Sequence, residues 1–142
     1  MKRILLPLAA ALALGAAATA DAATAGPQNF NVKVTLTPTC SISQAPNDVV
    51  FTYTSFGGAA TATGGDFKVK CTSGLTYTMG LDATSGTVIG LNYTLTLPAP
   101  VAGTGADQTY SIGGNMVAGQ SGTCAGPGTC SGTDVRTLTI TY

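Results

Sequence analysis

Apolar and polar residues alternate along much of the chain after residue 29, a pattern typical of β-strands that bury one face. The clearest alternating run comes first and carries four apolar residues at every second position: Phe30, Val32, Val34 and Leu36. Pro38 ends this run, because proline fixes φ and lacks the N–H that a β-ladder needs. The pattern therefore predicts an amphipathic strand over residues 30–36.

Further alternating runs predict several short strands after the first one. The longer runs present apolar residues on one face, at Phe67, Val69 and Cys71, at Tyr77, Met79 and Leu81, and at Leu91, Tyr93, Leu95 and Leu97. Shorter strand-like stretches lie at 41–43, 49–53, 88–89, 110–112 and 115–118, and Gly, Pro, Asn and Ser clusters predict loops at 59–65, 82–86, 98–105 and 119–132. No helical pattern of useful length occurs after residue 22. About seven short strands with turn signals between them favour an all-β sandwich with Greek-key connections.

The last residues predict a strand of their own. Leu138, Ile140 and Tyr142 alternate with threonines, so the sequence ends within the strand. We expect the outer edge of this strand to lack a partner within the chain. An unpaired edge with an apolar face is a template for another strand.

The first 22 residues have the pattern of a secretory signal peptide. Lys2 and Arg3 precede an apolar stretch over residues 4–14, and Ala-x-Ala motifs follow at 18–20 and 20–22, with cleavage expected between residues 20 and 25. The apolar stretch is shorter than the roughly 20 residues of a membrane-spanning helix. We therefore predict a signal peptide over 1–22, an extension over 23–38 and one β-domain over 39–142, in an exported protein.

The charge balance excludes an electrostatic nucleic-acid site. The 142-residue chain has six basic and six acidic residues, and its formal net charge is zero, so we expect no nucleic-acid partner. It contains no His and no Trp, and every acidic residue is Asp. Since the commonest general base and metal ligand are absent, we predict no enzymatic activity, no catalytic residues, no metal and no cofactor.

Four cysteines, at positions 40, 71, 124 and 130, lie in a chain predicted to be exported. Disulfides persist in oxidising compartments, and four cysteines allow three pairings. We favour Cys40 with Cys71 and Cys124 with Cys130, because a flexible Gly/Pro turn separates the second pair. A zinc cluster is disfavoured, since the chain has neither a C-x-x-C pair nor His.

Several segments, taken in order, resemble the spore coat protein U domain family, whose members are subunits of archaic chaperone/usher pili. They are "FNVKVTLTPTCSIS", "DFKVKCTSGLTYTMGL", "LNYTL", "YSIGGNMVAGQ" and "RTLTITY". The resemblance covers residues 28–142. It implies an incomplete immunoglobulin-like sandwich that lacks its last strand and receives a donor strand from another subunit. It also implies the Cys40–Cys71 bridge, whereas Cys124 and Cys130 are additional to the family pattern.

The resemblance also implies the site residues and partners. The donor strand would carry Phe30, Val32, Val34 and Leu36, and the acceptor edge would carry Leu138, Ile140 and Tyr142. The expected partners are identical or related pilin subunits, a periplasmic chaperone and an outer-membrane usher, with export through the periplasm to a bacterial surface pilus.

The energetics of strand donation fit this expectation. Burying four apolar side chains contributes at most about 6 to 12 kcal/mol, while a whole domain is stable by only about 5 to 15 kcal/mol. Only three residues separate Leu36 from Cys40, so we expect the strand to be supplied to another molecule. Such a head-to-tail contact generates a filament.

The alternatives to a pilus subunit of the rod are a minor tip subunit or a secreted carbohydrate- or surface-binding sandwich; a small secreted enzyme is disfavoured.

Overall fold

The predicted strand patterns become a set of short antiparallel strands in a computed structural model, which describes residues 24–142. Residues 1–23, which include the whole predicted signal peptide over 1–22, lie outside the described residues. The strands are β1 (Cys40–Gln44), β2 (Val49–Val50), β3 (Ala60–Thr61), β4 (Thr63–Gly64), β5 (Asp66–Cys71), β6 (Thr78–Leu81), β7 (Ser85–Val88), β8 (Leu91–Thr96), β9 (Asp107–Ser111), β10 (Gly113–Met116) and β11 (Leu138–Thr141). Within residues 24–142 there is no helix, so no helix there could cross a membrane.

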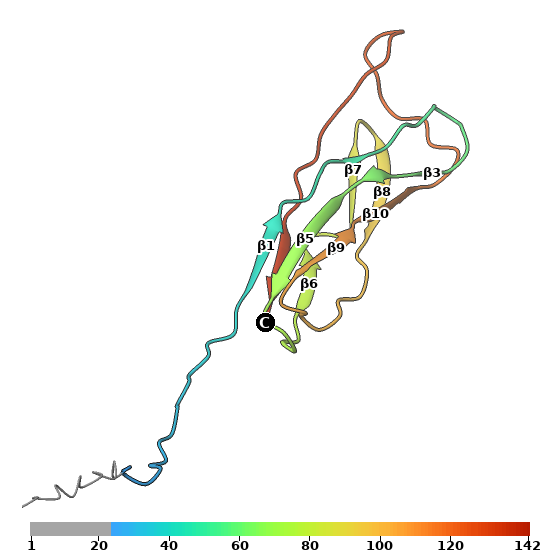
Figure 1. The fold of residues 1–142 in the computed structure, drawn as a ribbon. Coiled ribbons are helices and arrows are strands. Elements are labelled where there is room, and N and C mark those ends of the chain that lie inside the picture. Colours follow the sequence, from blue (N-terminus) through green and yellow to red (C-terminus); the bar gives the residue numbers. More distant parts are fainter. Residues whose placement is uncertain (1–23) are drawn as a thin grey trace, which may run out of the picture. The chain divides into compact units, whose positions relative to one another are not determined.

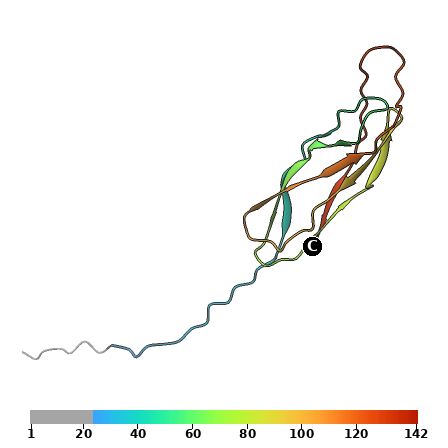
Figure 2. The ribbon, with the colours of Figure 1, turned by 90° about the vertical axis from the view of Figure 1, so that its right-hand side faces the viewer.

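All strand pairs are antiparallel, and they form the two layers of a sandwich (Figures 1 and 2). The order in one sheet is β1-β5-β9, and in a second β3-β10-β8-β7, while β11 pairs with β6 and β2 pairs with β4. The prediction of an all-β, immunoglobulin-like fold is confirmed. Among the described residues, β11 has β6 as its only ladder partner, so its other edge is unpaired.

The core is built from the faces that the alternation predicted. In β5, Phe67, Val69 and Cys71 are at most 2% exposed, and the intervening lysines point away from the core. The other buried apolar residues are Tyr77, Leu91, Tyr93, Leu95, Ile112 and Met116. Two layers of strands thus bury apolar side chains between them and leave polar faces outside.

Residues 30–36 do not form a strand in the structure, although their alternation predicted one. The four apolar side chains are 73% to 86% exposed, and no ladder includes them. An amphipathic segment becomes a strand only when a neighbour accepts its hydrogen bonds and covers its apolar face. The chain divides into two units, residues 1–34 and residues 35–142, and the sandwich lies in the second.

Two loop predictions were wrong in part. Residues 82–86 were predicted as a turn, but Ser85 begins β7, which forms a hairpin with β8. The turn lies instead at Ile89 and Gly90, whose φ angles are 46° and 70°. These are the left-handed values of a type I′ turn, which suits a two-residue hairpin. The loop predicted at 59–65 contains the short strands β3 and β4, which pair across to β10 and β2.

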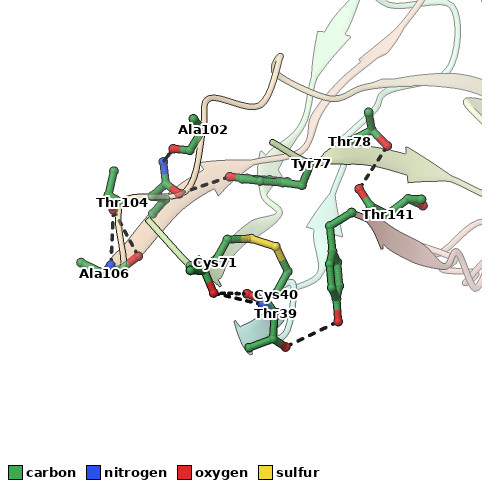
Figure 3. Close-up of a disulfide and its surroundings, with 12 residues drawn as sticks. Thr39, Cys40, Cys71, Tyr77, Thr78, Ala102, Thr104, Ala106 and Thr141 are labelled. Atoms are coloured by element: carbon green, nitrogen blue, oxygen red, sulfur yellow. Dashed lines mark hydrogen bonds between the residues drawn. A yellow bond between two sulfur atoms is a disulfide. The ribbon is translucent and has the colours of Figure 1, made fainter. Parts of the chain in front are cut away.

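The disulfides match the favoured pairing. Cys40 in β1 is bonded to Cys71 in β5, directly opposite each other in the β1–β5 register (Figure 3). The Cys40–Cys71 prediction is therefore confirmed. Cys124 and Cys130 are bonded to each other and close the exposed 124–130 loop. The first bridge fastens β1 to a core strand, and the second lies at the opposite end of the sandwich from β1's first residue (Figure 1).

Candidate functional site

The sandwich contains a groove of about 750 Å³. One side is formed by residues 46–53, which we name the first rim, and the other by residues 130–138, which we name the second rim. The floor between them consists of core side chains: Leu81, Val88, Ile89, Leu91, Tyr93, Leu95, Ile112 and Met116. The groove therefore opens directly onto the hydrophobic core.

The two rims are not joined to each other by a β-ladder. In the first rim, Val49 and Val50 pair with β4 on the side away from the groove. In the second rim, residues 130–137 belong to no strand. Among the described residues, no backbone hydrogen bond joins one rim to the other. Two facing edges with free backbone groups and an apolar floor form a site for one further β-strand.

The first rim is mostly apolar from Val49 onward, whereas the second rim is mostly polar, with Val135 and Leu138 as its apolar residues apart from Cys130. Val49, Phe51 and Tyr53 are half-buried and pack against the core. Val50 is 50% exposed and Val135 is 86% exposed. The Phe51 ring packs against Tyr93 on the floor, with 5.9 Å between centroids. Filling this groove with apolar side chains would remove these surfaces from water, which is favourable in proportion to area.

Arg136 holds the second rim against the neighbouring strands. Its guanidinium contacts the Asp134 carboxylate at 2.6 Å and donates to the Tyr93 hydroxyl at 2.9 Å and to the Ser85 carbonyl at 3.2 Å. The Tyr93 hydroxyl in turn donates to Asp134 at 2.7 Å. The rim is thus tied to β7 and β8, which keeps the groove open beside it.

Asp82 fixes the point where the second rim becomes β11. Its carboxylate accepts a hydrogen bond from the Thr137 N–H at 2.8 Å and lies 3.6 Å from Arg136. The Thr137 hydrogen bond, with smaller help from Arg136, lowers the pKa of Asp82. Burial and the Asp134 hydrogen bond raise the pKa of Tyr93, and the Tyr93 hydrogen bond raises that of Arg136. At neutral pH Asp82 is therefore charged and Tyr93 is neutral.

We predict that the stability of the Asp82→Asn variant falls less steeply in acid than the stability of the parent. A carboxyl whose pKa is lower in the folded state adds stability above its ordinary pKa, and this stability is lost as pH falls through the lowered pKa. The variant should therefore be less stable than the parent at neutral pH, while the difference vanishes in strong acid. Thermal unfolding at both pH values tests this, with the exposed Asp107→Asn as control. An equal difference at both pH values would contradict the role of the Asp82 charge.

A second cavity of about 330 Å³ continues the groove at one end. It shares four lining residues with the groove: Tyr53, Ile89, Leu91 and Cys130. Its remaining walls come from residues 54–55, 121–124 and 127–129. The 124–130 disulfide loop therefore borders this end of the groove.

The structure places two of the predicted acceptor residues in β11 and the third, Tyr142, directly after it, and only one of the three in the groove. Leu138 lines the groove. Ile140 lies opposite Met79 in the β6 ladder, and Tyr142 is 59% exposed, with its hydroxyl 3.5 Å from that of Thr39. This last contact lowers the pKa of Tyr142. Of the donor residues, Phe30, Val32 and Val34 lie in the first unit and Leu36 in the second, and all four are exposed. Their role and that of the acceptor edge remain predictions.

Sequence reasoning missed the first rim as part of the site. The apolar run Val49-Val50-Phe51 was interpreted only as a strand. The run carries no local signal of a rim, because Val49 and Phe51 pack against the core while Val50 is 50% exposed. Arg136, the single cation of the second rim, was likewise noted only for its charge.

The described residues contain no cluster of three or more potential metal ligands.

In comparisons with known proteins, the family model of the Spore Coat Protein U domain matches residues 27–97. This match spans half of the chain and includes the exposed segment 30–36, the Cys40–Cys71 pair and strands β1 to β8. Neither the search of curated proteins nor the search of solved structures gave a match.

Proposed function

Because the chain belongs to the Spore Coat Protein U domain family, we propose that it is a structural subunit of a bacterial surface pilus, which polymerises by donor-strand exchange. In this proposal, residues 30–36 of one subunit fill the groove of the next. The observation that carries it is the groove with an apolar floor between two rims that are not paired with each other, in a chain that also has an exposed amphipathic segment.

The segment and the groove match in length and polarity. Phe30 and Leu36 are six residues apart, about 20 Å in a strand, and the first rim spans seven steps, about 23 Å. Alternate side chains would point into the groove, where the floor is apolar, while Asn31, Lys33 and Thr35 would face water. Main-chain hydrogen bonds to both rims would complete the sheet, which is strand addition in trans.

Insertion into the subunit's own groove fits less well. If residues 30–36 folded back as a hairpin with Leu36 opposite Cys40, the register would place Phe30 opposite Pro46. The donor side chains would then lie beside β1 and leave residues 47–53 of the first rim uncovered. Donation to another molecule avoids this register and is the arrangement that we propose.

The empty groove also gives a reason for assistance during export. A sandwich with two unpaired edges and an open core is prone to aggregation. We propose that a periplasmic chaperone covers the groove, and that the donor segment of another subunit replaces it at an outer-membrane usher. The product is a head-to-tail filament on the cell surface, since a non-closing contact propagates. The role is structural and not enzymatic, in keeping with the absence of His from the sequence.

Deleting residues 23–37 tests the proposal. The mature chain, coexpressed with its chaperone, should give ladders on an unboiled denaturing gel, whereas the deletion variant should give only monomer. Both forms should still bind the chaperone, because the groove remains. Equal ladders from both forms would contradict the donor role, and a deletion variant that does not bind the chaperone would contradict the groove.

A further inference from the structure

The turn at residues 54–57 displays an exposed aromatic side chain at the groove's end. Phe56 is 76% exposed and its φ is 62°, a left-handed conformation that bulky residues rarely adopt. The Gly57 N–H donates to the Thr54 carbonyl at 2.9 Å, so Phe56 occupies the position of a β-turn that favours glycine. Strain of this kind persists where the surroundings enforce it, and it clusters at functional sites.

The turn is held rigidly by the segment that precedes the 124–130 loop. Phe56 N–H donates to the Gln120 carbonyl at 2.8 Å, and the Ser55 hydroxyl donates to the Ser121 carbonyl at 2.6 Å. Ser55 also lines the second cavity. We name the end that holds this turn and the 124–130 loop the tip. We name the opposite end, with Thr39, Cys40 and Tyr142, the base; Figures 1 and 2 show the C-terminus at the base and the 124–130 loop at the tip.

The direction of the donor strand decides which end meets the next subunit. This inference rests on the proposed function. In an immunoglobulin-like sandwich the sheet that contains β6 and β11 is antiparallel, so a donor beside β11 runs opposite to it. Since β11 runs toward the base, the donor runs from base to tip, and Leu36 leaves the groove at the tip.

The short connection then forces two surfaces together. Four Cα steps separate Leu36 from Cys40, which spans at most about 14 Å. Cys40 lies at the base of the donor subunit's own sandwich. The donor's base therefore must lie against the acceptor's tip, where Phe56 is exposed.

The base presents a matching apolar residue on a braced loop. Val101 is 60% exposed. The loop that follows it is fixed by backbone hydrogen bonds from Gly103 to Leu75 at 2.8 Å and from Gly105 to Cys71 at 3.0 Å, and Figure 3 shows Ala102 and Thr104 near the Cys40–Cys71 bridge. We infer that Phe56 at the tip of one subunit packs against Val101 at the base of the next copy, as a second contact beside the donor strand.

Engineered cysteines test this contact in fibres of the full mature chain. With Phe56→Cys and Val101→Cys together, mild oxidation should give ladders that survive boiling without reductant, because the described native cysteines are all paired. The control pair Thr109→Cys with Val101→Cys should give none, since Thr109 lies in the middle of strand β9 and away from the tip. Fibres that form but crosslink no better than the control would overturn the contact, as would boiled dimers from Val101→Cys alone, which indicate base-to-base docking. No fibres from any variant would overturn the proposed function, and this inference with it.

Phe56→Gly gives a second readout that separates the contact from a folding role. Glycine accepts the positive φ, so the monomer should unfold at a higher temperature than the parent. Its fibres, lacking the aromatic contact, should dissociate at a lower temperature in detergent. Binding of a synthetic peptide of residues 27–37 should be unchanged. Fibres as heat-resistant as the parent's would overturn the contact.

Discussion

Replacing Val34 with aspartate abolishes polymerisation while leaving the monomer folded. Val34 is 85% exposed in the subunit, so the change should not lower the unfolding temperature of the sandwich. In the fibre the same side chain would enter the apolar groove, where an unpaired carboxylate costs several kcal/mol beyond the lost valine burial. Each 1.4 kcal/mol changes an equilibrium constant tenfold. The affinity of the donor segment for the groove should therefore fall by more than about a thousandfold.

Asn31→Asp is the matched control for this variant. It adds the same charge to the same segment, three residues before Val34 and on the opposite, polar face. It should polymerise like the parent in unboiled denaturing gels and electron micrographs. If Val34→Asp polymerises as well as Asn31→Asp, the alternation of residues 30–36 has no role in assembly.

Replacing Cys40 and Cys71 together with serine should unfold the free subunit at physiological temperature. The bridge joins residues 31 apart in sequence, and the chain-entropy relation gives about 3 to 4 kcal/mol for a loop of this size. Cys71 is also 2% exposed, so serine adds a buried hydroxyl. Since a domain with an open groove lies at the low end of the usual 5 to 15 kcal/mol range, this loss is a large share of its stability.

The double variant Cys124→Ser with Cys130→Ser is the control for the core bridge. It opens a loop of only six residues at the surface and adds no buried hydroxyl, so its unfolding temperature should fall by less than that of the Cys40/Cys71 variant. Circular dichroism melts of the two variants and the parent make the comparison. Similar losses in both would contradict the central role of the Cys40–Cys71 bridge.

The sequence predicted the parts of the fold that depend on local pattern. The faces of β5 and β8 were found because burial of one face imposes a period of two, as at Phe67 and Val69 or at Leu91 and Tyr93. The β7–β8 turn was missed because Ile89 adopts a positive φ that its residue type disfavours. The positive φ of Ile89 is imposed by the pairing of β7 with β8, which needs a two-residue turn at this point.

The groove could be predicted only in part, since its two rims are far apart in the chain. The apolar alternation at Leu138 and Ile140 indicated one side of the groove. The acceptor edge predicted from it was too long, because Leu138 lines the groove and Ile140 does not. The first rim and the Arg136 contacts arise from tertiary packing, which no local pattern encodes. The exposed state of residues 30–36 has the same origin, because a strand forms only where a partner edge is available.

The most direct test of donor-strand exchange is to locate the donor peptide on the subunit. The Val34→Asp chain, which should stay monomeric, can be isotopically labelled and mixed with an unlabelled synthetic peptide of residues 27–37. The account predicts intermolecular NMR contacts from the peptide's Val32 and Val34 to groove residues such as Leu95 and Leu138, with amides of both rims protected from exchange. A peptide that leaves these residues unperturbed, or that binds elsewhere on the sandwich, would contradict the account.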